Sequence, residues 1–248
     1  GSTEIKKVAR RTLTEGIMKV KEIFTEDENN EKILTYGLLA SNARKSGGQI
    51  IGDPTEAALV QAALDLNLDQ ETLYKTHPRI SEIPFSSERK MMSVVVETEG
   101  GILTISKGAT EVILQKCSNL TGEQKMKVLK ANNNMADNAL RVLAIAYGSG
   151  IKEENLTFLG LVGMIDLPRE GVKQAIEVCQ KQAGIKVIMI TGDHLLTAQA
   201  IAKQIGIEGK AITGSELEKM PDLDFQKQVE EISIYARVNP EHKIRIIN

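Results

Sequence analysis

Hydrophobic positions change their spacing along the chain near residue 158. Before that point, short strand-like runs alternate with helices and polar turns. The clearest pair of runs is 91–106, where β-branched residues flank a polar, glycine-containing turn at 98–101, which predicts a hairpin. A symmetric register about this turn brings Lys90 and Lys107 to the same end of the hairpin, where two ammonium groups could face one anion.

After residue 158 the order becomes strand, helix, strand, helix, which favours parallel pairing of the strands. Residues 185–190 form a mostly apolar run of strand length, and a helix then ends at Gly206. A second helix is predicted over 168–182 and a further strand over 232–238. The helix before Gly206 is indicated by apolar residues at helical spacing, which are Ala198, Ile201, Ala202 and Ile205.

Composition excludes several classes of protein. The 248 residues are 42% hydrophobic and 26% charged, which is typical of a globular chain with a core and not of a disordered one. A net charge of −2 argues against a general nucleic-acid binder. No apolar run approaches the roughly 20 residues that span a bilayer. The two cysteines and three histidines are scattered, so neither a disulfide framework nor a metal site is predicted.

Thr191, Gly192 and Asp193 follow the apolar run 185–190 directly and precede a helix. Ligands of α/β sheets bind at this place, and backbone N–H groups at a helix start favour a phosphate. The alternative is a helix whose start is merely capped by Asp193.

Residues 52–56 open a helix over 57–66. Asp53 suits the N-cap, Pro54 the first helical position and Glu56 the third. Helix capping therefore explains all three residues on local grounds, and a ligand contact is the alternative.

Two further segments combine aromatic or basic residues with strand ends. Phe85 lies near basic residues in 84–90, so it could stack on a nucleobase or be a core residue at a strand entry. Lys107 and Gly108 run from a strand into a helix, where a lysine suits an anion, although a solvated lysine is the simpler interpretation.

Arginines also mark two strands. Arg141 interrupts the apolar stretch 139–146, where strand alternation puts it on the face of Leu143 and Ile145, so it either reaches the sheet edge or meets an anion. Arg237 and Lys243 flank residues 238–242 after the last predicted strand, where a lysine could neutralise a phosphate or simply lie on a surface loop.

The order of these segments along one chain resembles the cytoplasmic part of P-type cation-transporting ATPases, within the calcium-pump-like subfamily. The resemblance covers about residues 12–248. The segments that carry it are Thr12-Leu13-Thr14, Gly52 to Glu56, Phe85 to Lys90, Lys107-Gly108-Ala109, Leu140-Arg141, Asp166 to Arg169, Thr191-Gly192-Asp193 and Ala236 to Lys243.

The resemblance implies an α/β fold class with two domains. Residues 15–157 are similar to the nucleotide-binding domain, a twisted antiparallel sheet flanked by helices. Residues 158–248, with 1–14, are similar to part of the phosphorylation domain, which has a Rossmann-like fold of the haloacid-dehalogenase type.

The resemblance also implies roles in binding ATP. Phe85 would stack on adenine and Glu56 would contact the adenine end of the pocket. Lys90 and Lys107, with Gly108 beside it, would line the pocket, and Arg141 would reach toward the phosphates. In the whole enzyme, the γ-phosphate region would be held by Thr191, Gly192 and Asp193, with Arg237 nearby and Lys243 steadying the phosphorylated aspartate.

The chain departs from the family at the phosphorylation motif. Thr12-Leu13-Thr14 is preceded by Val8-Ala9-Arg10-Arg11, and no aspartate occurs before Asp27. The later segment that helps to bind Mg²⁺ in the family is also not found before Asn248. Since phosphoryl transfer to the enzyme needs both groups, we expect this chain to bind nucleotide without turnover.

The expected setting is the cytoplasmic face of a membrane, that of a bacterial plasma membrane for the parent pump, with the fragment itself soluble. Its partners would be nucleotide and the pump's transmembrane and actuator domains, and the transported ion would be calcium. Two other functions stay open: a free-standing haloacid-dehalogenase-type phosphatase, and a non-catalytic module that binds another protein.

Overall fold

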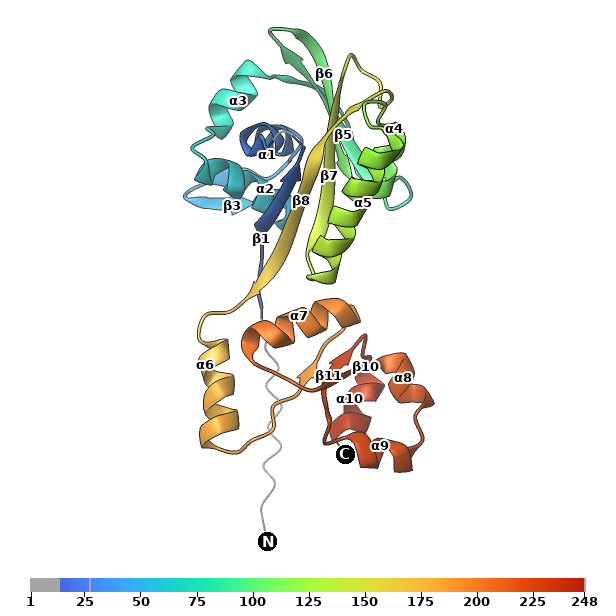
Figure 1. The fold of residues 1–248 in the computed structure, drawn as a ribbon. Helices are drawn as coiled ribbons and strands as arrows, with labels where there is room; N and C mark the ends of the chain where they lie inside the picture. The colour runs from blue at the N-terminus through green and yellow to red at the C-terminus, as the bar shows by residue number, and fades with distance from the viewer. Residues whose placement is uncertain (1–13, 27, 248) are drawn as a thin grey trace. The chain divides into compact units, whose positions relative to one another are not determined.

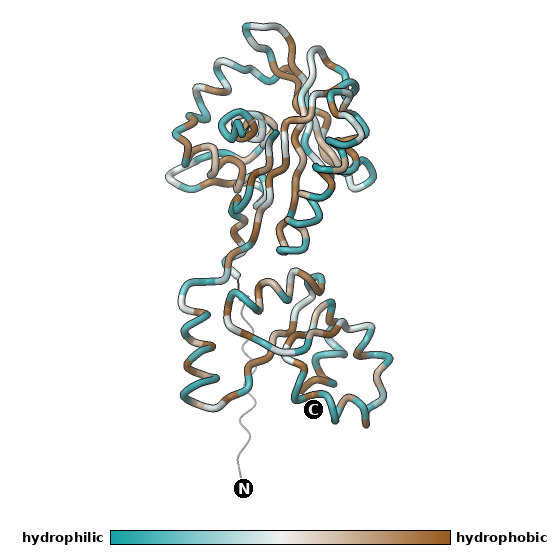
Figure 2. Tube along the Cα trace, viewed as in Figure 1, coloured by the Kyte–Doolittle hydropathy of each residue, from teal (hydrophilic) through white to brown (hydrophobic). Residues whose placement is uncertain are grey.

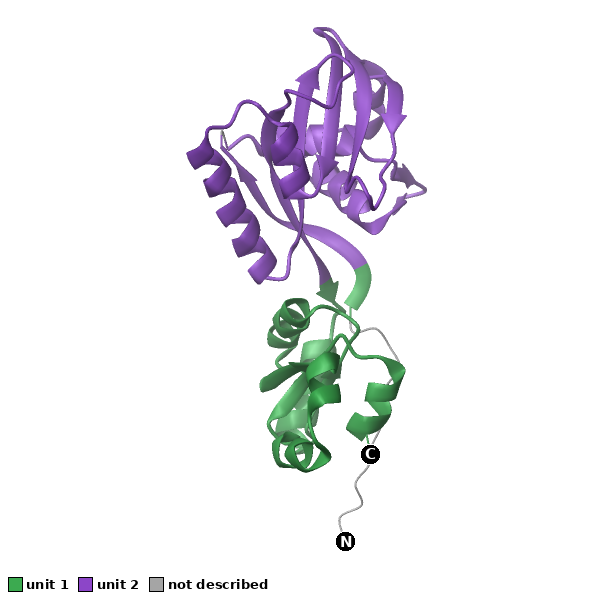
Figure 3. Ribbon diagram, turned by 90° about the vertical axis from the view of Figure 1, so that its right-hand side faces the viewer, with its two compact units in different colours: residues 1–16, 167–248 green, residues 17–166 purple. Residues whose placement is uncertain are grey.

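The computed structural model describes residues 14–26 and 28–247, so Thr12 and Leu13 of the motif above lie outside the described residues. The chain forms two compact units, shown in Figure 3. Unit 2 is Ile17–Asp166, and unit 1 is Leu167–Asn248 together with the chain up to Gly16. The boundary expected at residues 157 and 158 falls at the start of a long strand that pairs within unit 2, so the units divide at 166 and 167 instead.

Unit 2 is built on a six-stranded sheet in the order β1-β8-β7-β6-β5-β4, with antiparallel pairing from β4 to β8. The expected antiparallel sheet flanked by helices, and with it the α/β fold class, is thereby confirmed. The strands are β1 (Thr14–Thr25), β4 (Arg79–Ile83), β5 (Met91–Thr98), β6 (Gly101–Gly108), β7 (Arg141–Ser149) and β8 (Thr157–Pro168).

Helices cover both faces of this sheet, as Figure 1 shows. One face carries α1 (Asn30–Leu39), α2 (Pro54–Asp65) and α3 (Gln70–Thr76), with a small hairpin of β2 (Arg44–Ser46) and β3 (Gln49–Ile51) beside them. The other face carries α4 (Thr110–Lys116) and α5 (Gly122–Asp137).

The main core of unit 2 lies between the sheet and the helices α1 and α2. Alternate residues of the central strands point into it and are buried, because successive side chains of a strand point to opposite faces of the sheet. Figure 2 shows hydrophobic stretches along the central strands. The buried set includes Leu38, Leu59, Val94, Val96, Ile105 and Ile145.

The hairpin predicted over 91–106 is confirmed as β5 and β6, with Met92 opposite Lys107. The Ala109 N–H donates to the carbonyl of Lys90 at 2.9 Å. Lys90 and Lys107 therefore do lie at the same end of the hairpin.

Unit 1 contains a three-stranded parallel sheet in the order β10-β11-β9, which confirms the parallel pairing predicted for this half. Its strands are β9 (Met189–Ile190), β10 (Lys210–Thr213) and β11 (Ile232–Ala236). Its helices are α6 (Val172–Glu177), continued by one π-helical turn (Val178–Gln182), α7 (Leu195–Ile205), α8 (Gly214–Lys219), α9 (Asp222–Gln228) and α10 (Pro240–Ile247).

Three predicted bounds in unit 1 were wrong. A strand was predicted over 185–190, but β9 contains Met189 and Ile190 alone, because these are the residues of that run that pair with β11. The helix expected from 168 begins at 172, because Pro168 ends β8 and Gly171 adopts φ +82°. The strand expected to reach 238 ends at Ala236, because Arg237 turns the chain with φ +49°.

The helix predicted to end at Gly206 is confirmed as α7. Its four apolar residues at helical spacing are all buried, and Gly206 ends it at φ +81°. No helix of the described residues has both the length and the apolar character needed to cross a bilayer.

Gly160 of β8 lies against β1 so closely that it has no room for a side chain. A Cβ placed there would be 2.3 Å from the Phe24 carbonyl oxygen. We therefore predict that Gly160→Ala lowers the free energy of unfolding by about 1–3 kcal/mol, as overpacking does. The measurement is urea denaturation, with Gly122→Ala as control because a Cβ at Gly122 meets nothing within 4 Å. Equal stability of the two variants would contradict the prediction.

Candidate functional site

A buried ion pair joins β6 to α2. The Lys107 Nζ lies 2.8 Å from the Glu56 Oε1, and the two side chains are 6% and 14% exposed. The Lys107 Nζ also donates to the Ser41 Oγ at 3.3 Å. Burial lowers the pKa of the Lys107 ammonium, while attraction to the Glu56 carboxylate opposes that shift. The interpretation of Lys107 as a solvated strand-end lysine is therefore wrong.

The start of α2 places Glu56 beside this lysine. The Asp53 Oδ1 accepts hydrogen bonds from the N–H groups of Thr55 at 2.9 Å and Glu56 at 3.4 Å, so Asp53 is the predicted N-cap. The Glu56 carboxylate itself does not cap the helix. Its Oε2 accepts from the Asn42 N–H at 2.8 Å, and its Oε1 faces Lys107. Capping thus accounts for Asp53 and Pro54 but not for the side chain of Glu56.

Arg79 holds the chain that carries Asn42. Its guanidinium donates to the carbonyl oxygens of Leu39 at 2.7 Å and Ser41 at 2.8 Å, at the end of α1. It also pairs with Glu82 at 2.8 Å, and the Asn42 Nδ2 donates to that same carboxylate at 2.9 Å. This network satisfies the last carbonyls of α1 and fixes Asn42, which in turn holds Glu56.

Arg141 lies on the same face of the sheet. It is the first residue of β7, and Lys107 pairs with Ile145, which shares the Arg141 face by alternation. Its Nη1 donates to the Thr55 Oγ1 at 3.1 Å, also at the start of α2. Lys107, Glu56 and Arg141 therefore converge on the N-terminus of one helix.

Phe85 and Lys90 come from the loop between β4 and β5. The Phe85 side chain is 60% exposed, so the interpretation of it as a core residue is wrong. Lys90 is exposed and adopts φ +53°. A Cβ on Gly108 would lie 2.5 Å from the Lys90 carbonyl oxygen, so the glycine lets this loop approach the end of β6. The loop with the exposed ring is thereby tied to the strand that carries Lys107.

In unit 1, the loop of residues 191–193 is closed by its own side chains. The Thr191 Oγ1 donates to the Asp193 Oδ2 at 2.7 Å and accepts from the Asp193 N–H at 3.1 Å. The Asp193 carbonyl also accepts from the Arg237 N–H at 2.9 Å, which brings these two predicted sites together. His194, not Asp193, is the N-cap of α7, so capping does not explain Asp193. Gly192 is exposed at the tip.

Lys243 is exposed on α10, next to a residue that anchors that helix. The His242 Nε2 contacts the Glu218 Oε1 at 2.7 Å, and its Nδ1 accepts from the Asn239 N–H at 3.2 Å. Among the described residues, no hydrogen bond joins the Lys243 side chain to the loop of residues 191–193. The structure therefore brings Arg237 to that loop through its backbone and leaves Lys243 on the helix that follows.

Comparison with known proteins gives consistent matches. Residues 29–171 match the sequence model of the family "P-type ATPase, cytoplasmic domain N". The chain is 37% identical to calcium-transporting ATPase 1 of Bacillus cereus, over 95% of this chain and 30% of that protein. It is 39% identical to calcium-transporting ATPase 1 of Lactococcus lactis, over 92% and 28%. It is 38% identical to human calcium-transporting ATPase type 2C member 2, over 93% and 26%.

The family match covers more than half of the chain. The chain belongs to the P-type ATPase family. It spans 30% or less of the length of the three relatives named above. The resemblance proposed from the order of the motifs is confirmed.

The matched residues of this P-type ATPase cover most of unit 2 and all the predicted contacts within it. The site on that unit contains one exposed aromatic ring and several cations around a helix start, which suits a base joined to phosphates. The individual ligand roles stay predictions. A depression of about 320 Å³ at the start of α1 contains none of these residues.

Sequence reasoning missed Asn42 and Arg79, although both support Glu56. Neither belongs to a local motif, since their partners come from α1, α2 and β4. A signal for them exists only in the fold. Among residues 14–26 and 28–247, no group of three acidic, histidine or cysteine side chains could hold a metal ion.

Loss of Glu56 should destabilise unit 2, because it leaves the Lys107 ammonium buried without a counter-charge. We predict that Glu56→Ala lowers the free energy of unfolding by about 3 kcal/mol. The double variant Glu56→Ala/Lys107→Met should recover part of this loss, since it removes the unpaired charge as well. Guanidinium denaturation measures both.

The matched control is Glu71→Ala, which removes an exposed first-turn carboxylate from α3. It should change the stability by less than about 0.5 kcal/mol. If Glu56→Ala proves as mild as this control, the ion pair does not have the structural importance assigned to it.

Proposed function

We propose that this chain is the nucleotide-binding part of a calcium-transporting P-type ATPase, with ATP as the ligand of unit 2. The observation that carries the proposal is the buried pair of Lys107 and Glu56 at the start of α2, on the same sheet face as Arg141. Keeping a buried ammonium charged is costly, and such groups gather where a charged ligand is bound. Membership in the P-type ATPase family supports the same interpretation.

Each residue contributes through its chemistry. The exposed Phe85 ring offers a face on which adenine can stack. Glu56 accepts hydrogen bonds and suits the amino group of the base. Lys90 and Lys107 line the pocket, and Arg141 offsets the negative charge of the phosphates. Gly108 keeps the loop and the strand close enough for these groups to act together.

The loop of residues 191–193 in unit 1 suits a phosphate, because Gly192 exposes backbone beside a helix start. In the whole pump we assign Thr191, Gly192 and Asp193 to the γ-phosphate region, with Arg237 and Lys243 as supporting cations. No aspartate precedes Asp27, so this chain offers no carboxylate beside Thr12 for covalent phosphorylation. We therefore assign it nucleotide binding without turnover.

Magnesium would accompany ATP in the complete enzyme and offset charge on the phosphates. The binding proposed here is assigned to an aromatic ring and to charged side chains of unit 2, and none of these assignments is routed through the ion. The transmembrane and actuator domains of the pump are the proposed partners, and the cytoplasmic face of a membrane is the proposed location. The names of the relatives support calcium as the proposed cargo.

Calorimetric titration of ATP into the 248-residue chain, with and without Mg²⁺, tests this proposal. We predict saturable binding whose dissociation constant changes little with the ion, because an aromatic ring and side-chain cations supply the contacts. The absence of binding by a chain that circular dichroism shows to be folded would contradict the proposal. Release of phosphate during the titration would contradict the assignment of binding without turnover.

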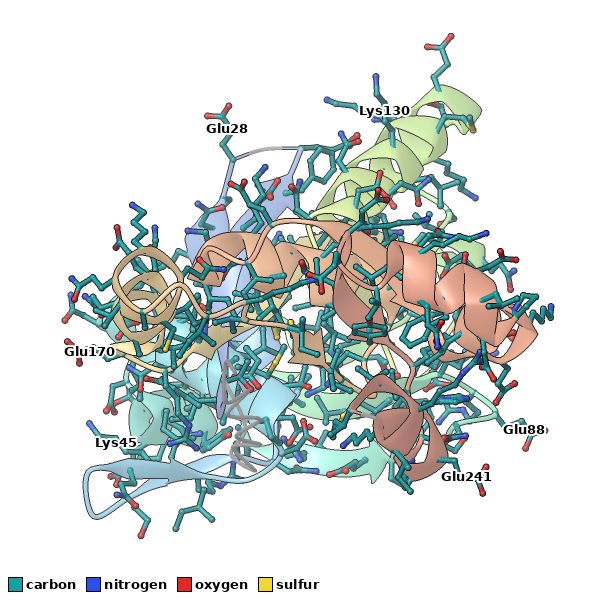
Figure 4. All side chains as sticks on the ribbon, turned by 90° about the horizontal axis from the view of Figure 1, so that it is seen from below. Glu28, Lys45, Glu88, Lys130, Glu170 and Glu241 are labelled. Atoms are coloured by element: carbon teal, nitrogen blue, oxygen red, sulfur yellow. The ribbon has the colours of Figure 1, made fainter. Side chains whose placement is uncertain are left out.

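Arg141→Gln probes the phosphate end without disturbing the core, because Arg141 is exposed. We predict that the dissociation constant for ATP rises about tenfold, as expected when a charge-assisted hydrogen bond is lost, while that for adenosine stays the same. The control Lys130→Gln removes one positive charge from the outer face of α5, where Figure 4 shows the side chain pointing away from the ribbon. Equal losses for ATP and adenosine would contradict the assignment of Arg141 to the phosphates.

A further inference from the structure

The side chain of Phe85 is mostly exposed, so packing restricts the ring less than its backbone does. It belongs to the loop 84–90, which joins β4 to β5, and its side chain is 60% exposed. A ring with so little contact takes its direction from the loop that carries it. The position of Phe85 therefore depends on whatever fixes the conformation of residues 84–90.

Backbone contacts fix the second half of this loop. The Lys90 N–H donates to the Ser86 carbonyl at 2.8 Å, and the Arg89 N–H donates to the Ser86 Oγ at 3.2 Å. The Lys90 carbonyl then accepts from Ala109 at 2.9 Å. These bonds close a turn over 86–90, which follows Phe85 in the sequence.

Arg89 is the side chain that connects both halves of the loop to the rest of unit 2. Its Nη2 lies 2.5 and 2.6 Å from the two carboxylate oxygens of Glu153, in the segment that joins β7 to β8. Its Nη1 donates to the Pro84 carbonyl at 3.4 Å, immediately before the ring. One planar group thus contacts the residue that precedes Phe85 and a separate loop 64 residues away.

The pair is sheltered enough to have a defined geometry. The Arg89 and Glu153 side chains are 31% and 18% exposed, whereas the neighbouring Glu88 is exposed and points away from the ribbon in Figure 4. The planar guanidinium of Arg89 contacts the Glu153 carboxylate through Nη2 and the Pro84 carbonyl through Nη1, so its two contacts together restrict its orientation. The exposed Glu88 carboxylate offers no comparable restraint on the loop.

We propose that Arg89 and Glu153 are positioning residues that set the Phe85 ring for the adenine of a bound nucleotide. Both act through the loop 84–90. The inference rests on the proposed function, since it presupposes that unit 2 binds ATP and that Phe85 stacks on the base. It adds a pair of residues from two loops to the groups that determine affinity.

The test is calorimetry with ATP alone on the 248-residue chain and its variants. Arg89→Gln and Glu153→Gln should each raise the dissociation constant about fivefold to tenfold, the coupling expected of residues that act through one another. Glu88→Gln and Glu154→Gln remove charges from exposed neighbours and should bind as the wild type does. Exchanging the charges in Arg89→Glu/Glu153→Arg should restore part of the affinity.

Phe85→Ala separates positioning from a general effect on the fold. In that background Arg89→Gln should cause no further loss, because the ring it positions is gone. A residue that only stabilises unit 2 would weaken binding equally in both backgrounds, and that result would overturn the inference, as would unchanged binding by both single variants. If the wild type itself fails to bind ATP, the proposed function falls and the inference with it.

Discussion

The buried contact between Lys107 and Glu56 determines how the site on unit 2 is organised. An ammonium that is 6% exposed needs a counter-charge, and the only described carboxylate paired with it comes from the first turn of α2. That requirement fixes the start of α2 against the end of β6. Asp53 caps the N-terminus of α2. The Asn42 N–H donates to the Glu56 carboxylate, and Arg79 binds the carbonyl of Ser41, which precedes Asn42. The polar groups of the site are thus positioned by the same contacts that stabilise the fold.

The other side chains assigned to the site are more exposed than Lys107 and Glu56. Arg141 is exposed and bonded to Thr55, and Phe85 projects from a loop that is tied down at its ends. This division between a rigid interior and an exposed aromatic suits a ligand that has one flat end and one charged end. Membership in the P-type ATPase family is consistent with it, since the matched domain contains every one of these residues.

Local patterns predicted the elements whose cause is local. The hairpin of β5 and β6, the cap at Asp53 and the buried face of α7 depend on residues close together in sequence. The pairing of Lys107 with Glu56 spans 51 residues, and no local pattern distinguishes it from helix capping and a solvated lysine. Resemblance, not spacing, brought these residues together in the prediction. The strand over 185–190 was overestimated because a ladder needs a partner, which an apolar run alone does not reveal.

We propose that the nucleotide binds to one face of unit 2, at the start of α2. Amide chemical-shift mapping of the isotopically labelled chain with ATP tests it most directly, because it locates the ligand without any substitution. We predict that the largest shifts fall on residues 41–42, 55–56, 85–90, 107–109 and 141. Shifts concentrated at α4 and α5, on the opposite face of the sheet, would contradict it.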